Sequence, residues 1–250
     1  MEALVSIITP TYNSEKTLEK TYESILSQNY ANWEWLVTDD CSTDDTYSML
    51  KGLSKKDYRI LINRNEINSG AAVSRNQSID RASGKYIAFI DSDDAWEPSK
   101  LSTQIKLMEE KCLSFTFTAF EMVDSDKRHI STVDTHLTAE LDYKDMLKKK
   151  ATLGCSTVVL KRELISDIRM PLIRTGQDYA YWLSILRLGG KAYPINEILT
   201  KYSVLPNSIS RNKFNKAKRQ WQIYREIEGL DLPTSISCFL FYAYRAVFRK

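Results

Sequence analysis

The fold of this chain is decided by the stretch Gly84-Lys85-Tyr86-Ile87-Ala88-Phe89-Ile90-Asp91-Ser92-Asp93-Asp94. Its apolar part, Tyr86–Ile90, predicts a strand that is buried on both faces, as in a parallel sheet between helices. Three acidic side chains follow at once. Because an unpaired carboxylate in a core costs several kcal/mol, these acids must emerge at the carboxyl end of the strand, where open α/β sheets bind their ligands.

Asp91 and Asp93 alternate along this stretch, so both carboxylates can point past the edge of the sheet. Carboxylate oxygens are hard ligands, and they suit Mg²⁺ or Mn²⁺ that is bound together with phosphate oxygens. The plainer alternative is an acidic surface turn that caps a helix near Glu97. The position directly after a buried strand favours the metal site.

Around this stretch, predicted strands alternate with predicted helices. Three strands precede Tyr86, at residues 4–8, 33–38 and 58–62. Helices are expected to begin after Ser14, near Thr46 and after Asn68. Gly84 is expected to cap the third helix at its carboxyl end. This order is typical of an α/β fold with a parallel, doubly wound central sheet and flanking helices.

These strands are not followed by a glycine-rich phosphate loop, because the chain has neither a Gly-x-Gly-x-x-Gly nor a Walker lysine motif. The first two strand ends carry Tyr12 and the acidic pair Asp39–Asp40 instead. A tyrosine ring can stack on a base, and a carboxylate can accept a hydrogen bond from a uracil N–H or a ribose hydroxyl. We therefore expect a nucleotide whose diphosphate is held by the metal.

Four pieces of the first half resemble the family 2 glycosyltransferases, which have the GT-A fold. They are Ile8-Thr9-Pro10-Thr11-Tyr12-Asn13, Asp39-Asp40-Cys41-Ser42-Thr43-Asp44, Gly70-Ala71-Ala72-Val73-Ser74-Arg75-Asn76 and Phe89-Ile90-Asp91-Ser92-Asp93-Asp94. Their order and spacing fit the family. The resemblance implies a GT-A, Rossmann-like, mostly parallel sheet and a hexosyltransferase that uses a UDP-sugar.

The resemblance also implies roles for single residues. The nucleotide is expected to contact Pro10, Thr11, Tyr12, Asp40 and Arg75. The diphosphate and its Mn²⁺ or Mg²⁺ are expected at Asp91, Ser92 and Asp93, with Asp94 as a weaker candidate. Of these, Asp93 is expected to be the direct metal ligand. Cys41 stands where the family commonly has glycine, which we expect to alter only the geometry of its loop.

In the second half, Asp178 follows Gln177 at the start of a predicted helix whose apolar face includes Trp182. A first-turn aspartate can simply complement the helix dipole. The resemblance favours a general base instead, because the family's base is the aspartate of a Glu-Asp or Gln-Asp pair before an aromatic-rich helix. Gln177 and Trp182 are weaker candidates. A base on the face opposite the diphosphate implies a single displacement that inverts the anomeric centre.

Other parts of the second half carry weaker signals. A helix is expected at 100–111, strands at 114–120 and 154–160, and a second helix at 142–150. Residues 124–136 are expected to form a loop or hairpin. Its His129 and His136 are possible metal ligands, although a solvated loop histidine is the commoner case.

The C-terminal residues 206–250 are basic and aromatic-rich, and they predict a helical extension. Weak candidates for a contact with the diphosphate are Ser210, Arg211 and Lys213. The extension is expected either to anchor the protein at the membrane surface or to pack on the domain as a helical pair. An anchor would imply a polyprenyl-diphosphate-linked acceptor, as in O-antigen, capsule or teichuronic-type polymer synthesis.

Composition sets wider limits. The 250 residues carry a formal charge of +3 and are 43% hydrophobic, which is enough for one large domain or a domain with an appendage. The resemblance implies a GT-A domain at 1–205, with a nucleotide half at about 1–96 and an acceptor half at about 97–205. This balance gives no argument for nucleic acid. Four scattered cysteines, no signal peptide and no spanning run predict a cytoplasmic protein that is peripheral to the inner membrane.

Two alternatives to a transferase stay open. One is a non-catalytic sugar-nucleotide-binding subunit of an assembly complex. The other is an aspartate-nucleophile phosphatase, whose pattern needs threonine or valine where this chain has Ala95.

Overall fold

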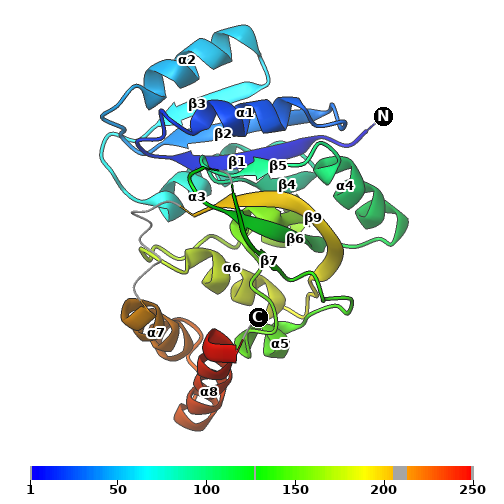
Figure 1. The fold of residues 1–250 in the computed structure, drawn as a ribbon, viewed down its shortest axis with the longest axis vertical. Coiled ribbons are helices and arrows are strands. Elements are labelled where there is room, and N and C mark those ends of the chain that lie inside the picture. The colour runs from blue at the N-terminus through cyan, green and yellow to red at the C-terminus, as the bar shows by residue number, and fades with distance from the viewer. Residues whose placement is uncertain (1, 127, 205–212, 249–250) are drawn as a thin grey trace.

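The structure is a computed structural model that describes residues 2–126, 128–204 and 213–248. Within these ranges, the strands form one mixed sheet in the order β3-β2-β1-β4-β8-β6-β9-β5, and β7 pairs with β6 (Figure 1). The strands are β1 (Val5–Thr11), β2 (Trp33–Asp39), β3 (Ile60–Arg64), β4 (Tyr86–Phe89), β5 (Ala95–Trp96), β6 (Phe115–Val123), β7 (His129–Val133), β8 (Val158–Lys161) and β9 (Tyr193–Ser203).

Helices cover the sheet. The α-helices are α1 (Leu18–Leu26), α2 (Thr46–Lys56), α3 (Ala71–Arg81), α4 (Lys100–Glu110), α5 (Tyr143–Leu147), α6 (Gln177–Leu186), α7 (Lys213–Gln222) and α8 (Leu232–Phe248). Two short 3-10 helices, η1 (Cys155–Thr157) and η2 (Arg162–Ile165), flank β8, and a π-helix, η4 (Ile223–Ile227), continues α7.

The nucleotide half of the sheet, β3-β2-β1-β4, is parallel because a helix connects each strand to the next. Beyond β4 the sheet is mixed, since β8 runs antiparallel to both β4 and β6. The alternation of strands and helices confirms the predicted α/β fold. Residues 129–133 confirm a hairpin in the segment where the sequence left a loop or hairpin open.

β4 is buried on both faces, as its apolar sequence predicts. Ile87 and Phe89 point into a core with α3 and α6, whereas Tyr86 and Ala88 point into a second core with α1 and α4. A strand that is packed on both sides has a fixed end, so the acidic turn after Phe89 is held in one position.

Two predicted helix caps are wrong. The structure ends α3 at Arg81, so Gly84 does not cap it. Gly84 instead lies against β1, where a β-carbon would come within 2.7 Å of the Leu4 carbonyl oxygen, and only glycine fits there. Ser14 does not cap α1 either, because that helix begins at Leu18, after a turn in which the Ser14 carbonyl accepts the Leu18 N–H.

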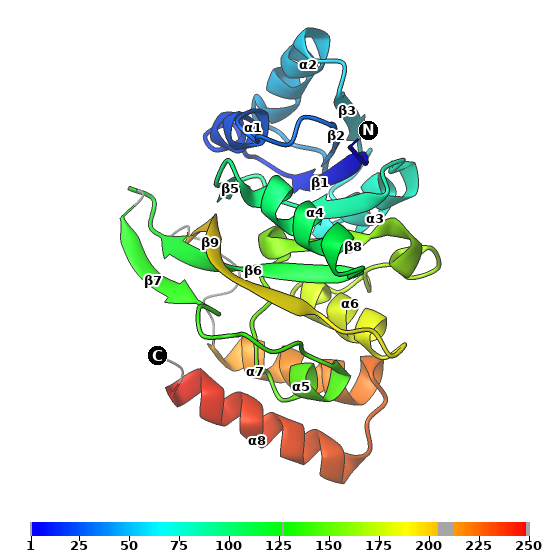
Figure 2. The same cartoon turned by 90° about the vertical axis from the view of Figure 1, so that its right-hand side faces the viewer.

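The C-terminal helices α7 and α8 lie beside α5 and α6, at the end of the molecule opposite α2 (Figure 2). Their inner side chains Ile223, Tyr224 and Cys238 are buried in the same core as α6. The Tyr224 hydroxyl donates to the Leu147 carbonyl at 2.6 Å. In the described ranges, every helix is too short or too polar to span a bilayer. The division into a domain and an extension at residue 205 stays a proposal.

Candidate active site

The candidate site lies where the carboxyl ends of β1, β2 and β4 meet at one edge of the sheet (Figure 1). Thr11, the last residue of β1, pairs in register with Asp39 of β2, and Tyr12 directly follows it. The Tyr12 side chain is 48% exposed, as stacking on a base requires. Thr11 is buried, and its hydroxyl has no partner among the described residues.

Asp40 organises the loop that leads into α3. Its Oδ1 accepts hydrogen bonds from the Asn65 amide at 2.7 Å and the Ser69 N–H at 2.8 Å, and its Oδ2 accepts from the Gly70 N–H at 2.7 Å. Gly70 has φ +91°, which suits glycine. Since a carboxylate can accept about four hydrogen bonds, Asp40 keeps room for about one more. Its predicted contact with the base therefore has to share the carboxylate with this structural role.

Asn65 is a site residue that sequence reasoning missed. It is buried next to Asp40, and its Oδ1 has no partner within the described ranges. Together with the Thr11 hydroxyl, it gives this hollow two buried polar atoms that a bound nucleotide can satisfy. Only its position just after β3 could have signalled this role.

Arg75 of α3 pairs with Asp91 at the end of β4. Its Nη2 donates to Asp91 Oδ1 at 2.5 Å, while its buried Nε and Nη1 have no partner in the part of the chain that the structure describes. Burial by itself lowers the pKa of Arg75, but the neighbouring Asp91, Cys155 and Asp178 together outweigh it, so the pKa is raised. A cation with unused donors therefore lies next to the predicted diphosphate position.

The three acids after β4 differ in their surroundings. Asp94 is 1% exposed and accepts from the Ser156 hydroxyl at 2.5 Å and from the Ser203 N–H at 2.9 Å. It thus joins the end of β4 to η1 and β9, and burial raises its pKa well above the usual range. Asp91 and Asp93 stay partly exposed. Both carboxylate oxygens of Asp94 therefore serve contacts within the protein.

Ser92, the residue between the two exposed acids, is buried and contacts the loop after β1. Its hydroxyl lies 2.8 Å from that of Ser14. The Asp93 carbonyl accepts from the Ser203 hydroxyl at 2.5 Å. The acidic turn is thus fixed from both sides before any ligand binds.

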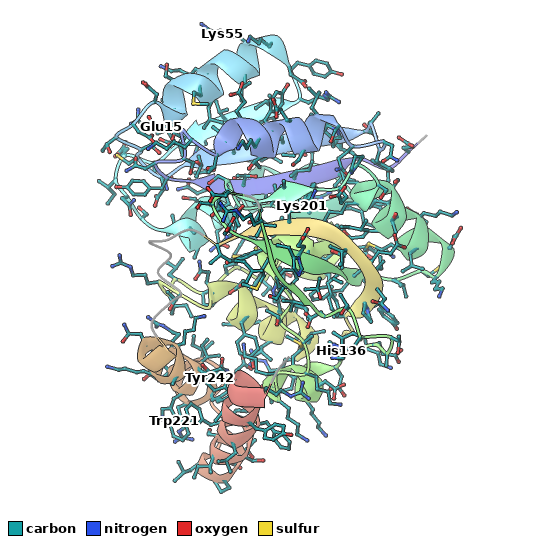
Figure 3. All side chains as sticks on the ribbon, in the orientation of Figure 1. Glu15, Lys55, His136, Lys201, Trp221 and Tyr242 are labelled. Carbon is teal, nitrogen blue, oxygen red and sulfur yellow. The ribbon has the colours of Figure 1, made fainter. Side chains whose placement is uncertain are left out.

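Two carboxylates at this tip fit a metal that completes its coordination with diphosphate oxygens, because Mg²⁺ commonly uses one or two protein carboxylates. Within the described residues, no three His, Cys, Asp or Glu side chains converge on a metal position by themselves. His129 pairs with Glu121 at 2.7 Å, and His136 is exposed near α5 (Figure 3). Neither histidine approaches the acidic turn.

Asp178 lies in the first turn of α6, after Gly176 in the left-handed conformation. Its charge and that of Asp91 both raise the pKa of Arg75 and of the buried Cys155. Both acids therefore lie near Arg75, on different structural elements. Asp178 is partly exposed, as a base that meets a substrate has to be.

The weaker candidates have other positions. Trp182 is fully buried, packs against Phe89 and Phe115, and donates to the Leu153 carbonyl at 3.2 Å, so the structure makes it a core residue. The Oε1 atom of Gln177 is buried without a partner in the described part of the chain. Ser210 and Arg211 lie outside the described residues, as does the Lys213 side chain.

From Asp178 a groove of about 1390 Å³ extends between α6, α7 and α8. Its walls include Arg174 and Gly176 before α6, Arg219 and Trp221 of α7, and Tyr242 of α8. Trp221 and Tyr242 are labelled at the lower end of the molecule in Figure 3. The sequence pointed to these helices but not to a groove between them and Asp178.

The sequence is similar to those of known proteins. The sequence model described as Glycosyl transferase family 2 matches residues 6–169. A Bacillus subtilis (strain 168) protein, provisionally named as the teichuronic acid biosynthesis glycosyltransferase TuaG, is 44% identical over 247 residues, which cover 99% of this chain and 97% of that protein. An Escherichia coli protein, the UDP-Glc:alpha-D-GlcNAc-diphosphoundecaprenol beta-1,3-glucosyltransferase WfgD, is 41% identical over 88% of this chain and 85% of its own length.

Among solved structures, Staphylococcus aureus TarS 1-349 in complex with UDP-GlcNAc superposes with a TM-score of 0.77. The match covers 98% of this chain and 73% of that chain, at 20% sequence identity. At that identity the similarity concerns the fold alone.

Proposed function

The chain belongs to glycosyl transferase family 2 and is a glycosyltransferase, and from this we propose that it moves a sugar from a UDP-sugar to a hydroxyl of a polyprenyl-diphosphate-linked saccharide in bacterial cell-surface polysaccharide synthesis. One observation carries the proposal: Asp91 and Asp178, on different elements, both lie close enough to the buried Arg75 for their charges to raise its pKa. A leaving diphosphate and an incoming alcohol need two such groups across one hollow. Family membership leaves no support for the phosphatase alternative.

The donor is proposed to bind at the carboxyl ends of β1 and β2. Tyr12 would stack on the uracil ring. The remaining acceptor position of Asp40 and the unpartnered Oδ1 of Asn65 would accept N–H or ribose O–H donors. The unpartnered N–H groups of Arg75 would donate to the diphosphate, so all three polar groups gain partners when the donor binds.

Asp91 and Asp93 would hold a divalent cation, Mn²⁺ or Mg²⁺, against the diphosphate. When bound, such an ion supplies positive charge that stabilises the departing nucleoside diphosphate. Arg75 contributes a further positive charge from the protein at the same point, and its bond to Asp91 keeps that carboxylate oriented.

Asp178 would accept the proton of the acceptor hydroxyl while the oxygen attacks the anomeric carbon from the face opposite the diphosphate. The C–O bond to the diphosphate breaks as the new glycosidic bond forms, so an α-linked donor gives a β-glycoside. A covalent intermediate is not needed. The inverting course is proposed because Asp178 is taken as the base and no second carboxylate is assigned as a nucleophile.

The acceptor is proposed to be presented at the cytoplasmic face of the inner membrane. An exposed apolar stripe runs along α8 at Leu232, Ile236, Leu240 and Tyr244. Lys148 lies 5.2 Å from the ring of Phe241 on the same helix. A helix with an apolar stripe and neighbouring cations suits an anionic lipid surface.

The direct test is an incubation of the full chain with Mn²⁺, a panel of UDP-sugars beginning with UDP-glucose, and dodecyl α-N-acetylglucosaminyl diphosphate. We expect mass spectrometry to find one added hexose and nuclear magnetic resonance to find a β-linkage. Absence of calorimetric binding of UDP and of every UDP-sugar, together with no product, would contradict the proposal.

A further inference from the structure

The groove next to Asp178 is rich in positive charge. Six basic residues line it, and they are Lys149, Arg174, Lys216, Lys218, Arg219 and Arg245. Only two acidic residues line it, Asp178 and Glu226. Such an excess of cations in one hollow suits an anionic ligand.

Three of these six cations are not paired with carboxylates of the described residues. Among the residues that the structure describes, Arg174, Lys216 and Arg219 form no ion pair, unlike most basic side chains around the sheet. Arg219 donates only to the neutral Gln222 amide oxygen, at 2.5 Å. Their charges are therefore available to a ligand.

The groove also has an aromatic wall. Trp221 of α7 meets Phe239 of α8 edge-to-face, with ring centroids 5.6 Å apart, and Phe239 contacts Tyr242 at 5.6 Å. All three residues line the groove. One hollow thus combines a carboxylate, a set of cations and a row of aromatic rings, which matches an alcohol, a phosphate group and a hydrocarbon joined in one molecule.

We propose that this groove binds the acceptor, with its sugar at Asp178, its diphosphate on Arg174 and the cations of α7, and its first isoprenoid units on the aromatic wall. This inference rests on the proposed function, because Asp178 is taken as the base. A hydroxyl on the sugar that carries the diphosphate can reach Asp178 only if that diphosphate lies within one pyranose ring of it. Arg219 lies close to the start of α6, since its Cγ would be 3.7 Å from a β-carbon at Gly176, two residues before Asp178.

The test neutralises Lys216 and Arg219, one turn apart on α7, as Lys216→Gln with Arg219→Gln. The matched control is Lys55→Gln with Lys56→Gln on α2, which removes the same charge at the other end of the molecule (Figure 3). Both proteins are compared with the unaltered chain on dodecyl α-N-acetylglucosaminyl diphosphate, and on the dodecyl glycoside that lacks the diphosphate.

We expect the α7 variant to raise KM for the diphosphate acceptor about tenfold or more, since two charge-assisted contacts are lost. Its KM for the UDP-sugar and its rate on the diphosphate-free glycoside should stay within about twofold of the unaltered chain. The α2 control should change none of these values. Equal KM values for the diphosphate acceptor in both variants would overturn the proposal.

A binding measurement separates this inference from the proposed function. Dodecyl diphosphate, which has no sugar, should bind the unaltered chain and the α2 control in a calorimetric titration, and bind the α7 variant about tenfold more weakly. No binding to the unaltered chain would refute the groove, even if transfer occurs. Conversely, binding without transfer from any UDP-sugar would count against the proposed function alone.

Lipid headgroups are the other source of phosphate. The assays use no vesicles, so a change in KM cannot come from the membrane. If the α7 variant loses only its binding to phosphatidylglycerol vesicles and keeps its KM for the diphosphate acceptor, the cations serve the membrane surface and the inference is wrong.

Discussion

Arg75 Nη2 and Asp91 Oδ1 lie 2.5 Å apart at the carboxyl end of β4, and this bond uses only one edge of the guanidinium. The other N–H groups are buried and have no partner in the described residues, which costs stability in the free protein. Such an arrangement is explained if a ligand completes it. Arg75 should therefore contribute more to ligand binding than to the stability of the free protein.

Arg75→Met should weaken calorimetric UDP binding about tenfold or more, because the diphosphate loses its donors. The melting temperature without ligand should change little, because the partly exposed Asp91 can be hydrated once its partner is gone. Arg81→Met on the same helix is the control: Arg81 contacts Thr38 and Ser78, so this variant should lose stability and keep UDP binding. UDP binding that is weakened by Arg81→Met but unchanged by Arg75→Met would exclude a role of Arg75 in binding.

Asp93 and Asp94 should separate into a ligand role and a structural role. Asp93→Asn should abolish the Mn²⁺ dependence of UDP binding with little change in melting temperature. Asp94→Ala should lower the free energy of unfolding by about 2 kcal/mol, because the buried Ser156 hydroxyl and Ser203 N–H lose their acceptor. Binding with and without chelator, and urea unfolding, measure the two effects. Tight Mn²⁺-dependent UDP binding by Asp93→Asn would contradict the metal assignment.

Asp178→Asn should reduce kcat by about 10²- to 10⁴-fold, since the acceptor hydroxyl keeps its proton. Its dissociation constant for the UDP-sugar should stay within about twofold, because the donor lies across the hollow. The exposed Glu226 lines the same groove, so Glu226→Gln is the control and should keep kcat. Comparable rates for the Asp178 and Glu226 variants would exclude Asp178 as the base.

The stripe on α8 should determine membrane binding. Ile236→Glu with Leu240→Glu should reduce sedimentation with phosphatidylglycerol vesicles about tenfold without changing the melting temperature, because both side chains are solvent-exposed. The control is Tyr58→Glu with Leu188→Glu, which places the same charges on exposed residues outside α8. Equal vesicle binding by both double variants would argue against α8 as the contact surface.

Lys100 should make stability depend on pH. It is fully buried, with its amine 2.6 Å from Gln104 Oε1, and burial lowers its pKa well below the usual value. Between the folded and unfolded pKa values the unfolded chain binds more protons, so the free energy of unfolding should rise with pH. Urea unfolding at pH 7 and pH 9.5 should show this rise, and Lys100→Met should remove part of it. If the free energy of unfolding rises equally with pH in the unaltered chain and in Lys100→Met, Lys100 does not cause the rise.

Much of the fold could be predicted from the sequence, because strand burial and helix periodicity are local patterns. The run Tyr86–Ile90 indicated a strand that is packed on both faces, and the acids after it indicated its exposed end. The helix α6 was likewise visible, in the aromatic side chains that follow Asp178. The strand β9, which pairs with β6 and β5, was not predicted, because its partners are distant in sequence.

Only the tertiary structure decided which polar residues serve the fold and which remain for a ligand. Asp93 and Asp94 are adjacent and chemically identical, yet the Asp94 carboxylate is buried against Ser156 and Ser203, from segments more than 60 residues away, whereas Asp93 stays partly exposed. Trp182 and Trp221 both lie in aromatic-rich segments, yet one fills the core while the other lines a groove. Local sequence sets which groups a strand or helix carries, but long-range packing sets which of them lose contact with water, and that loss determines their chemistry.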